Sequence, residues 1–126
     1  GYSLGAAVAT QAALVMSPYA LVLLSPFSSI YAMACRQIST YWASILRPFL
    51  WDTYATDDAL IRLSRERTNM QVVIWHGALD SVIPVTMGRE LARQHKQWIQ
   101  YREFKNLNHD LLWYIRDDLN ILLHQL

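Results

Sequence analysis

The first 24 residues of the chain, GYSLGAAVATQAALVMSPYALVLL, contain the pattern that decides the fold. Residues 4–16 are almost all Ala, Val, Leu and Met, so they predict a helix that is apolar on every side and therefore buried. Ser17-Pro18 ends this helix, because proline cannot continue the backbone hydrogen-bond ladder. Residues 20–24 are a short apolar run, typical of a strand covered on both faces. A helix followed closely by a buried strand indicates an α/β sheet.

The rest of the chain continues this alternation. Residues 72–75 (VVIW) form a second apolar run, and residues 99–104 (IQYREF) alternate as a more exposed edge strand would. Helices are expected over 57–67, from Pro84 to residue 96, and in the last segment, where apolar residues recur at helical spacing: Leu112, Ile115, Leu119, Leu122 and Leu126. Residues 30–54 are expected to be helical and are rich in aromatic side chains. Strands alternating with such helices predict three parallel strands with flanking helices.

The composition excludes several classes of protein. The 126 residues suffice for one domain, and 53% hydrophobic residues exclude a disordered segment. With 11 basic and 10 acidic residues, the net charge of +1 gives no reason to expect nucleic acid as a partner. Cys35 is the only cysteine, so no intramolecular disulfide forms. Residues 12–24 are too short and too interrupted to span a membrane, and we expect a soluble cytoplasmic protein without a transmembrane segment.

Chemically active residues follow the ends of the predicted strands or precede the first helix. Gly1-Tyr2-Ser3-Leu4-Gly5 opens the first helix, Asp80 follows the strand at 72–75, and His109 follows the strand at 99–104. The carboxyl ends of parallel strands meet at one edge of a sheet, where ligands bind. A serine hydroxyl becomes a good nucleophile when a histidine takes its proton and a carboxylate orients that histidine. Glycines two residues either side of the serine relieve crowding in a tight turn.

Each of these residues also has a simpler interpretation. Ser3 could cap the helix that follows it, Asp80 could be a turn residue, and His109 could cap the last helix. His76 is expected to pack rather than react. A metal site is not expected, because the histidines and Cys35 lack the short spacing of metal ligands.

Three motifs together resemble the C-terminal half of the α/β-hydrolase superfamily: GYSLG at 1–5, HGALDSVIP at 76–84 and Asn108-His109. The stretches SPFSSI at 25–30 and PVTMGRELA at 84–92 resemble the monoacylglycerol-lipase-like and Bem46-like serine hydrolases within it. The resemblance covers nearly the whole chain. It implies that Ser3 is the nucleophile, Asp80 the acid and His109 the base. The backbone N–H of Leu4 would be an oxyanion-hole donor.

The resemblance also implies a reaction and a substrate class. The enzyme would cleave an ester or related acyl bond of a small or lipid-like molecule through an acyl-enzyme, with no cofactor or metal. Residues about 31–56 would form a short helical lid-like insert, whose aromatic side chains line an acyl pocket or anchor the insert against the sheet. The substrate pocket would include Tyr2, Phe27, Trp51 and Ile83. Neither the exact substrate nor the oligomeric state is predicted.

The chain begins at the serine turn, so we expect residues 1–126 to be part of a longer domain. The strand before the turn and the loop with a second oxyanion-hole donor would be absent. With no strand holding Ser3, the chain alone is expected to be inactive. Two alternatives remain: a catalytically silent α/β-hydrolase fold that acts as a binding module, and an unrelated doubly wound domain such as a flavodoxin-like one.

Overall fold

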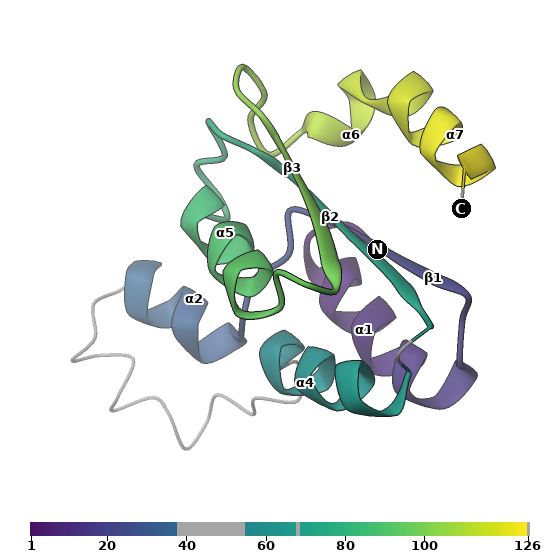
Figure 1. The fold of residues 1–126 in the computed structure, drawn as a ribbon. Helices are drawn as coiled ribbons and strands as arrows, with labels where there is room; N and C mark the ends of the chain where they lie inside the picture. Colours follow the sequence, from purple (N-terminus) through teal and green to yellow (C-terminus); the bar gives the residue numbers. More distant parts are fainter. Residues whose placement is uncertain (38–54, 68, 126) are drawn as a thin grey trace.

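A computed structural model of the chain describes residues 1–37, 55–67 and 69–125. Helices and strands alternate through most of this structure (Figure 1). In chain order the described elements are α1 (Leu4–Met16), β1 (Ala20–Leu24), α2 (Ile30–Gln37), α4 (Thr56–Glu66), β2 (Gln71–Gly77), α5 (Val85–Gln94), β3 (Ile99–Phe104), α6 (Leu111–Tyr114) and α7 (Arg116–Gln125).

The strands form one parallel sheet in the order β1-β2-β3. The β1–β2 register runs from Ala20↔Gln71 to Leu24↔Trp75, and β2 pairs with β3 as far as Gly77↔Phe104. The predicted class, three parallel strands with flanking helices, is therefore confirmed. Strand β2 is longer than the predicted strand at 72–75, because its pairing with β3 continues through His76 and Gly77.

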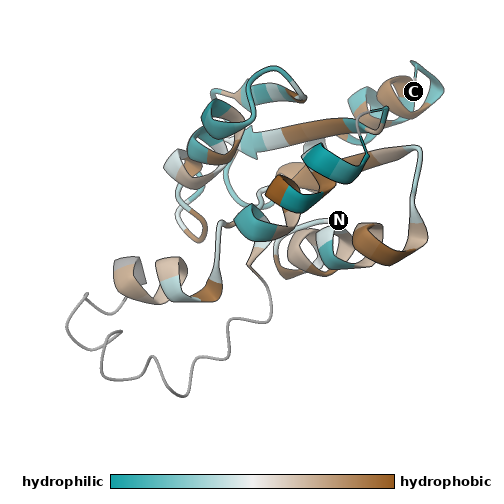
Figure 2. Ribbon diagram, turned by 60° about the horizontal axis from the view of Figure 1, so that its bottom comes forward, coloured by the Kyte–Doolittle hydropathy of each residue, from teal (hydrophilic) through white to brown (hydrophobic). Residues whose placement is uncertain are grey.

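Helices cover both faces of the sheet. In Figure 1, α1, α4 and α5 lie on one side of the strands, and α6 and α7 lie on the other. Successive strand residues point to opposite faces, so Leu23 and Ile74 enter one core while Leu24, Val73 and Trp75 enter the other. Figure 2 shows apolar colouring along the middle of the sheet and along much of α1. Each face thus has its own apolar core.

Helix α1 is less buried than predicted. Its buried residues are Ala6, Ala7, Thr10 and Ala13, and the helix packs against β1 and α4. Its other side includes Val15 and Met16, which are 84% and 77% exposed. The expectation of a helix buried on every side is therefore wrong for this structure, because only one side of α1 meets other described elements.

The last segment is not one helix. The chain bends at Ile115, between α6 and α7. Ile115 is buried against Leu111, and its carbonyl oxygen accepts the N–H of Leu119 at 2.8 Å. None of the residues of α7 is itself buried. The bend puts Ile115 into the core and lets α7 lie at the surface.

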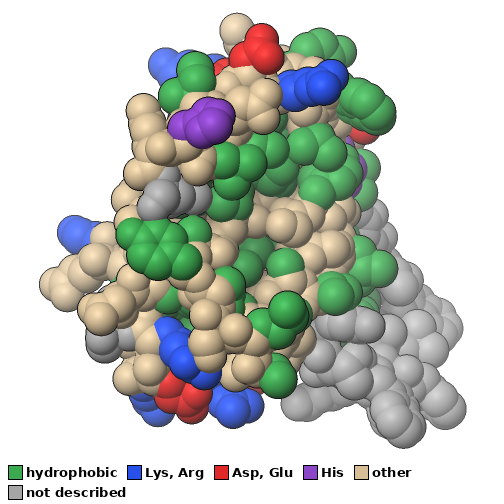
Figure 3. Space-filling view, turned by 90° about the vertical axis from the view of Figure 1, so that its right-hand side faces the viewer, with side chains coloured by type: hydrophobic (Ala, Val, Ile, Leu, Met, Phe, Trp, Pro, Cys, Tyr) green, Lys and Arg blue, Asp and Glu red, His purple; other side chains and the backbone are tan. Residues whose placement is uncertain are grey.

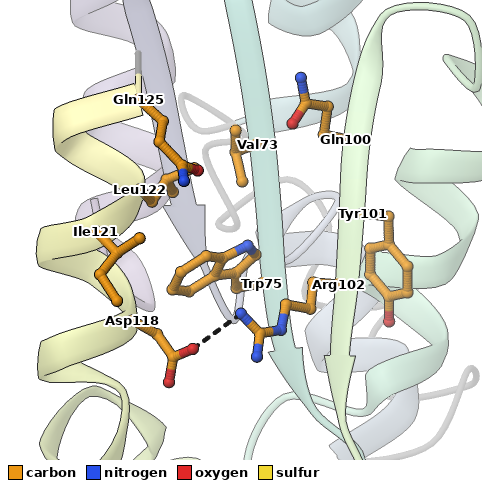
Figure 4. A pocket seen from close by; sticks show the side chains of 9 residues that line it. All are labelled: Val73, Trp75, Gln100, Tyr101, Arg102, Asp118, Ile121, Leu122 and Gln125. Atoms are coloured by element: carbon orange, nitrogen blue, oxygen red, sulfur yellow. Dashed lines mark hydrogen bonds and ion pairs between the residues drawn. The ribbon is translucent and has the colours of Figure 1, made fainter.

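Arg102 of β3 connects α7 to the sheet. Its guanidinium lies 5.3 Å from the centre of the Trp75 ring and 4.5 Å from that of Phe104, and it pairs with Asp118 of α7 at 3.0 Å (Figure 4). A hollow of about 260 Å³ lies beside this pair. Ser3, Asp80 and His109 are not among the residues that line it.

The two ends of the predicted insert lie side by side. The carbonyl oxygen of Ser28 accepts the N–H of Thr56 at 2.9 Å and that of Asp57 at 3.3 Å. Helix α2 lies just after this point and α4 starts at it. The aromatic residues Tyr41, Trp42, Phe49, Trp51 and Tyr54 lie outside the described residues.

Within residues 1–37, 55–67 and 69–125, no helix is both long enough and apolar enough to cross a membrane.

Candidate active site

Ser3, His109 and Asp80 form a continuous hydrogen-bonded row. His109 Nε2 lies 3.1 Å from Ser3 Oγ, and His109 Nδ1 lies 2.8 Å from Asp80 Oδ2. Ser3 stands beside the end of β1, while Asp80 and His109 follow β2 and β3. The structure thus brings together three residues that are up to 106 positions apart in the sequence.

The turn at Ser3 is strained and held in place. Ser3 has φ 53° and ψ −124°, in the region that non-glycine residues rarely adopt. Its N–H donates to the carbonyl oxygen of Leu24 at 2.9 Å. The N–H of Leu24 donates to the carbonyl oxygen of Gly1 at 2.8 Å, and the Gly1 nitrogen donates to that of Val22 at 2.7 Å. Residues 1–3 therefore pair with β1 in parallel. The expectation that no strand holds Ser3 is therefore wrong, because β1 does so.

The two glycines of the turn differ in whether a side chain would fit at their position. A Cβ on Gly1 would lie 2.7 Å from Ala6 Cα and 2.8 Å from Ala9 Cβ, so a side chain there would collide with α1. A Cβ on Gly5 would meet no described atom within 4 Å. The crowding inferred from the sequence is therefore present at Gly1 and absent at Gly5.

The carboxylate of Asp80 is buried and well bonded. Its Oδ1 accepts the N–H groups of Val82 at 2.9 Å and Ile83 at 2.8 Å. Burial alone would raise the pKa of Asp80, but the hydrogen bonds with the His109 ring and the Ile83 N–H outweigh it and hold the pKa below its usual value. Asp80 is therefore charged at neutral pH and oriented toward His109.

The loop that carries His109 is held by Tyr2 and by Gly77. The Tyr2 hydroxyl donates to the carbonyl oxygen of His109 at 2.8 Å, and the two rings lie 5.2 Å apart. A Cβ on Gly77 would lie 2.5 Å from the carbonyl oxygens of both Leu107 and Asn108. Glycine at this position lets the loop cross directly over the end of β2, which brings His109 to Asp80.

Leu4 is the residue predicted to donate its backbone N–H to an oxyanion. It is the first residue of α1, so its N–H has no acceptor within the helix. The positive end of the helix dipole adds to the attraction for a negative oxygen beside Ser3.

The four residues predicted to line a substrate pocket have different surroundings. Tyr2 is engaged with His109. Phe27 and Ile83 are buried together in a cluster with Ala7 and Met87, close to the start of α2. Trp51 lies outside the described residues. The structure therefore brings Phe27 and Ile83 together, in the core between α1 and α5.

Two buried residues beside Asp80 were not predicted as site residues. Ser25 has φ 46° and is fully buried, and its Oγ makes no hydrogen bond of good geometry with any described group. His76 is fully buried, with Nε2 3.5 Å from Asp80 Oδ2. Their positions at the carboxyl ends of β1 and β2 are the only feature of the sequence that could have marked them as site residues. Among the described residues, no group of three or more His, Cys, Asp or Glu side chains could hold a metal ion.

Comparison with known proteins identifies the fold. No family model and no curated protein matches the chain. Among solved structures, BpoC of Mycobacterium tuberculosis H37Rv, described provisionally as a non-heme bromoperoxidase, is 16% identical with a TM-score of 0.58. An alpha/beta fold family hydrolase of Bacillus anthracis str. Sterne is 13% identical with a TM-score of 0.60.

Both similarities include 99% of this chain and 64% or 65% of the other, so the chain spans just under two thirds of either protein. A doubly wound domain of unrelated type is excluded by these matches. The chain has the fold of an α/β hydrolase, of which it carries the carboxyl-terminal part.

Proposed function

We propose that this chain belongs to a serine hydrolase that cleaves an ester or related acyl bond, with Ser3 as nucleophile, His109 as base and Asp80 as acid. The observation that carries the proposal is the row of two hydrogen bonds from Ser3 Oγ through the His109 ring to Asp80. The strained Ser3 backbone and the first turn of α1 support it, because both are features of an exposed nucleophile beside an anion-binding site.

The reaction runs in two steps. His109 Nε2 takes the proton from Ser3 Oγ as the oxygen attacks the substrate carbonyl, and the Leu4 N–H stabilises the oxyanion. The imidazolium of His109 keeps its Nδ1–H on Asp80 and returns the other proton to the leaving group. Water then attacks the acyl-enzyme by the same route, and Ser3 recovers its proton. None of these steps uses a cofactor.

The substrate proposed is a small acyl ester or a lipid-like molecule. The buried cluster of Phe27, Ile83 and Met87 lies beside the segment that leads into the insert, and it would form the apolar floor of an acyl site. Residues about 31–56 would be a lid-like insert. A cytoplasmic location is proposed on the sequence grounds given above.

The test uses the protein with its complete reading frame. Hydrolysis of nitrophenyl esters with acyl chains of increasing length is measured for the wild type, Ser3→Ala and the control Ser64→Ala, which lies on α4 away from the row. We expect Ser3→Ala to lower kcat by more than about 10³-fold and Ser64→Ala to leave it unchanged. A folded wild type without Ser3-dependent hydrolysis would favour a catalytically silent binding module instead.

A further inference from the structure

His76 is a second histidine close to Asp80. It is the last residue but one of β2, and its side chain is fully buried. Asp80 Oδ2, which accepts from His109 Nδ1 at 2.8 Å, also lies 3.5 Å from His76 Nε2. One carboxylate oxygen therefore lies near two imidazole rings, and the proposed mechanism uses only one of these rings.

The hydrogen bonds of His76 define its protonation. Its Nε2 lies 2.9 Å from the carbonyl oxygen of Ile83, which only accepts, so Nε2 carries the hydrogen. Its Nδ1 is buried and has no hydrogen-bond partner among the described groups. Burial is the main cause that lowers the pKa of His76, since protonation would bury a charge and an unpaired donor. These contacts favour the neutral form of the ring.

The charged groups around His76 agree with a neutral ring. Asp80 and His109 face it from the loops after β2 and β3, and Glu103 pairs with it in the sheet register. Glu103 is itself held by two hydrogen bonds from Arg89 of α5, at 2.8 and 2.7 Å. Both carboxylates thus have other partners, and neither depends on a charge at His76.

Helix α5 is shaped to admit the ring. A Cβ on Gly88, inside α5, would collide with His76 Nδ1 and lie 3.2 Å from Cγ of the same ring. Glycine weakens a helix interior relative to alanine, so its presence there has a packing reason. The position of the ring is thus fixed by α5 on one side and by Ile83 on another.

We propose that His76 is a positioning residue that holds Asp80 in the orientation that His109 requires. The Ile83 N–H donates to Asp80 Oδ1, and the Ile83 carbonyl oxygen accepts from His76 Nε2. The backbone of Ile83 therefore connects His76 to Asp80. His76 Nε2 also lies 3.5 Å from Asp80 Oδ2, and a neutral ring leaves the charge of this carboxylate in place. The catalytic consequence rests on the proposed function, whereas the effect on the Asp80–His109 hydrogen bond does not.

The test compares two substitutions in the protein with its complete reading frame. His76→Phe keeps a planar ring but removes both nitrogens, and His76→Gln keeps an N–H near the position of Nε2. His124→Gln, on the exposed α7, is the matched control. For each folded variant we measure kcat and KM for a nitrophenyl ester from pH 5 to 9. NMR follows the downfield proton between His109 Nδ1 and Asp80.

We expect His76→Phe to lower kcat about 10- to 100-fold with KM within about twofold, since small misplacements of catalytic groups have effects of this size. The low-pH limb of kcat/KM moves to lower pH, because the imidazolium loses part of its carboxylate partner. The downfield proton shifts or disappears. His76→Gln restores all three readouts, and His124→Gln changes none.

Two outcomes overturn the inference. One is a folded His76→Phe protein whose downfield proton and pH profile match the wild type. The other is an equal loss in His76→Phe and His76→Gln that follows only the fraction of folded protein. If the wild type shows no Ser3-dependent hydrolysis, the proposed function fails, and the NMR comparison alone still decides whether His76 positions Asp80.

Discussion

Ser3 keeps a backbone conformation that costs free energy. A non-glycine residue at φ 53° and ψ −124° is strained by about 1–3 kcal/mol, and it persists only where its surroundings hold it. The hydrogen bonds of Gly1 and Ser3 to β1 supply that constraint. The serine hydroxyl is thereby directed at His109 rather than used as a helix cap, and no cap hydrogen bond is formed by Ser3.

The sequence predicted some residues of the site but not the contacts that hold them. The spacing of Ser3, Asp80 and His109 relative to the predicted strands was enough to propose that they meet. The roles of Tyr2 and His76 were not visible, because a hydroxyl donating to a carbonyl oxygen 107 positions away leaves no periodic pattern. A buried histidine and a reactive one also look alike in a sequence.

Tyr2→Phe tests how the backbone of His109 is held. The change removes the hydroxyl that donates to the His109 carbonyl oxygen but keeps the ring beside the imidazole. We expect a loss of about 1 kcal/mol in the free energy of unfolding, the usual worth of one such hydrogen bond, and a smaller kcat with similar KM. Denaturant unfolding and steady-state kinetics measure the two effects. Unchanged values of both would show that this hydrogen bond holds nothing.

The lowered pKa of His76 predicts how stability depends on pH. At a pH between the folded-state pKa of His76 and its ordinary pKa of 6.5, the unfolded chain binds a proton that the folded chain does not. The free energy of unfolding contributed by this group is therefore fully present above about pH 6.5 and falls as the pH is lowered through that value. The slope reaches at most about 1.4 kcal/mol per pH unit.

Urea unfolding between pH 7.5 and 5 measures this dependence in the wild type and in His76→Gln, which cannot titrate. We expect the variant to show the shallower decline. Parallel curves for the two proteins would mean that His76 accepts a proton as readily when folded as when unfolded.

Loops crossing at close range assemble the site from separate elements. The segment after β3 crosses Gly77 at the end of β2, and Leu79 N–H donates to the Leu107 carbonyl oxygen at 3.0 Å. The strands themselves were predictable, since apolar runs bounded by turn residues indicate them directly. The bend at Ile115 was not, because Leu112, Ile115 and Leu119 keep helical spacing on both sides of it.

Gly77→Ala and Gly5→Ala test whether the loop after β3 must cross close to the end of β2, with Gly5→Ala as the control. Alanine at 77 would collide with the carbonyl oxygens of Leu107 and Asn108, so the loop must move and His109 must leave Asp80. We expect kcat/KM to fall by about 100-fold. Alanine at 5 meets no described atom within 4 Å and favours the helix by up to about 1 kcal/mol.

Thermal unfolding and ester hydrolysis of both variants give the comparison. A Gly77→Ala protein as active as the wild type would show that the crossing is not needed. A strongly destabilised Gly5→Ala protein would show that its surroundings differ from those described.

On the scale of the whole molecule, apolar side chains collect on the side of α7, β1 and α1. Val15 and Met16 of α1 and Ile121 and Leu123 of α7 are all more than half exposed: 84%, 77%, 59% and 56%. Figure 3, which faces this side of the molecule, shows apolar side chains spread over it. The sequence could not reveal this surface, because the same apolar pattern also fits a helix covered on every side.

This surface predicts the behaviour of the 126-residue chain on its own. Exposed apolar groups of this extent favour association, so we expect the isolated chain to form oligomers or aggregates in light scattering. The double variant Val15→Lys, Met16→Lys should have a smaller hydrodynamic size, while Arg62→Lys, on α4, serves as control. A monomeric wild-type chain at high concentration would contradict the expectation.

The central claim is that Ser3 is a nucleophile activated by His109 and Asp80. The most direct measurement is labelling of the protein, with its complete reading frame, by a fluorophosphonate probe, followed by mass spectrometry of the peptide that contains residue 3. We predict one covalent adduct on Ser3, lost in Ser3→Ala and slowed by more than about 10³-fold in His109→Ala. A folded wild-type protein without an adduct, or one labelled equally in Ser3→Ala, would contradict the account.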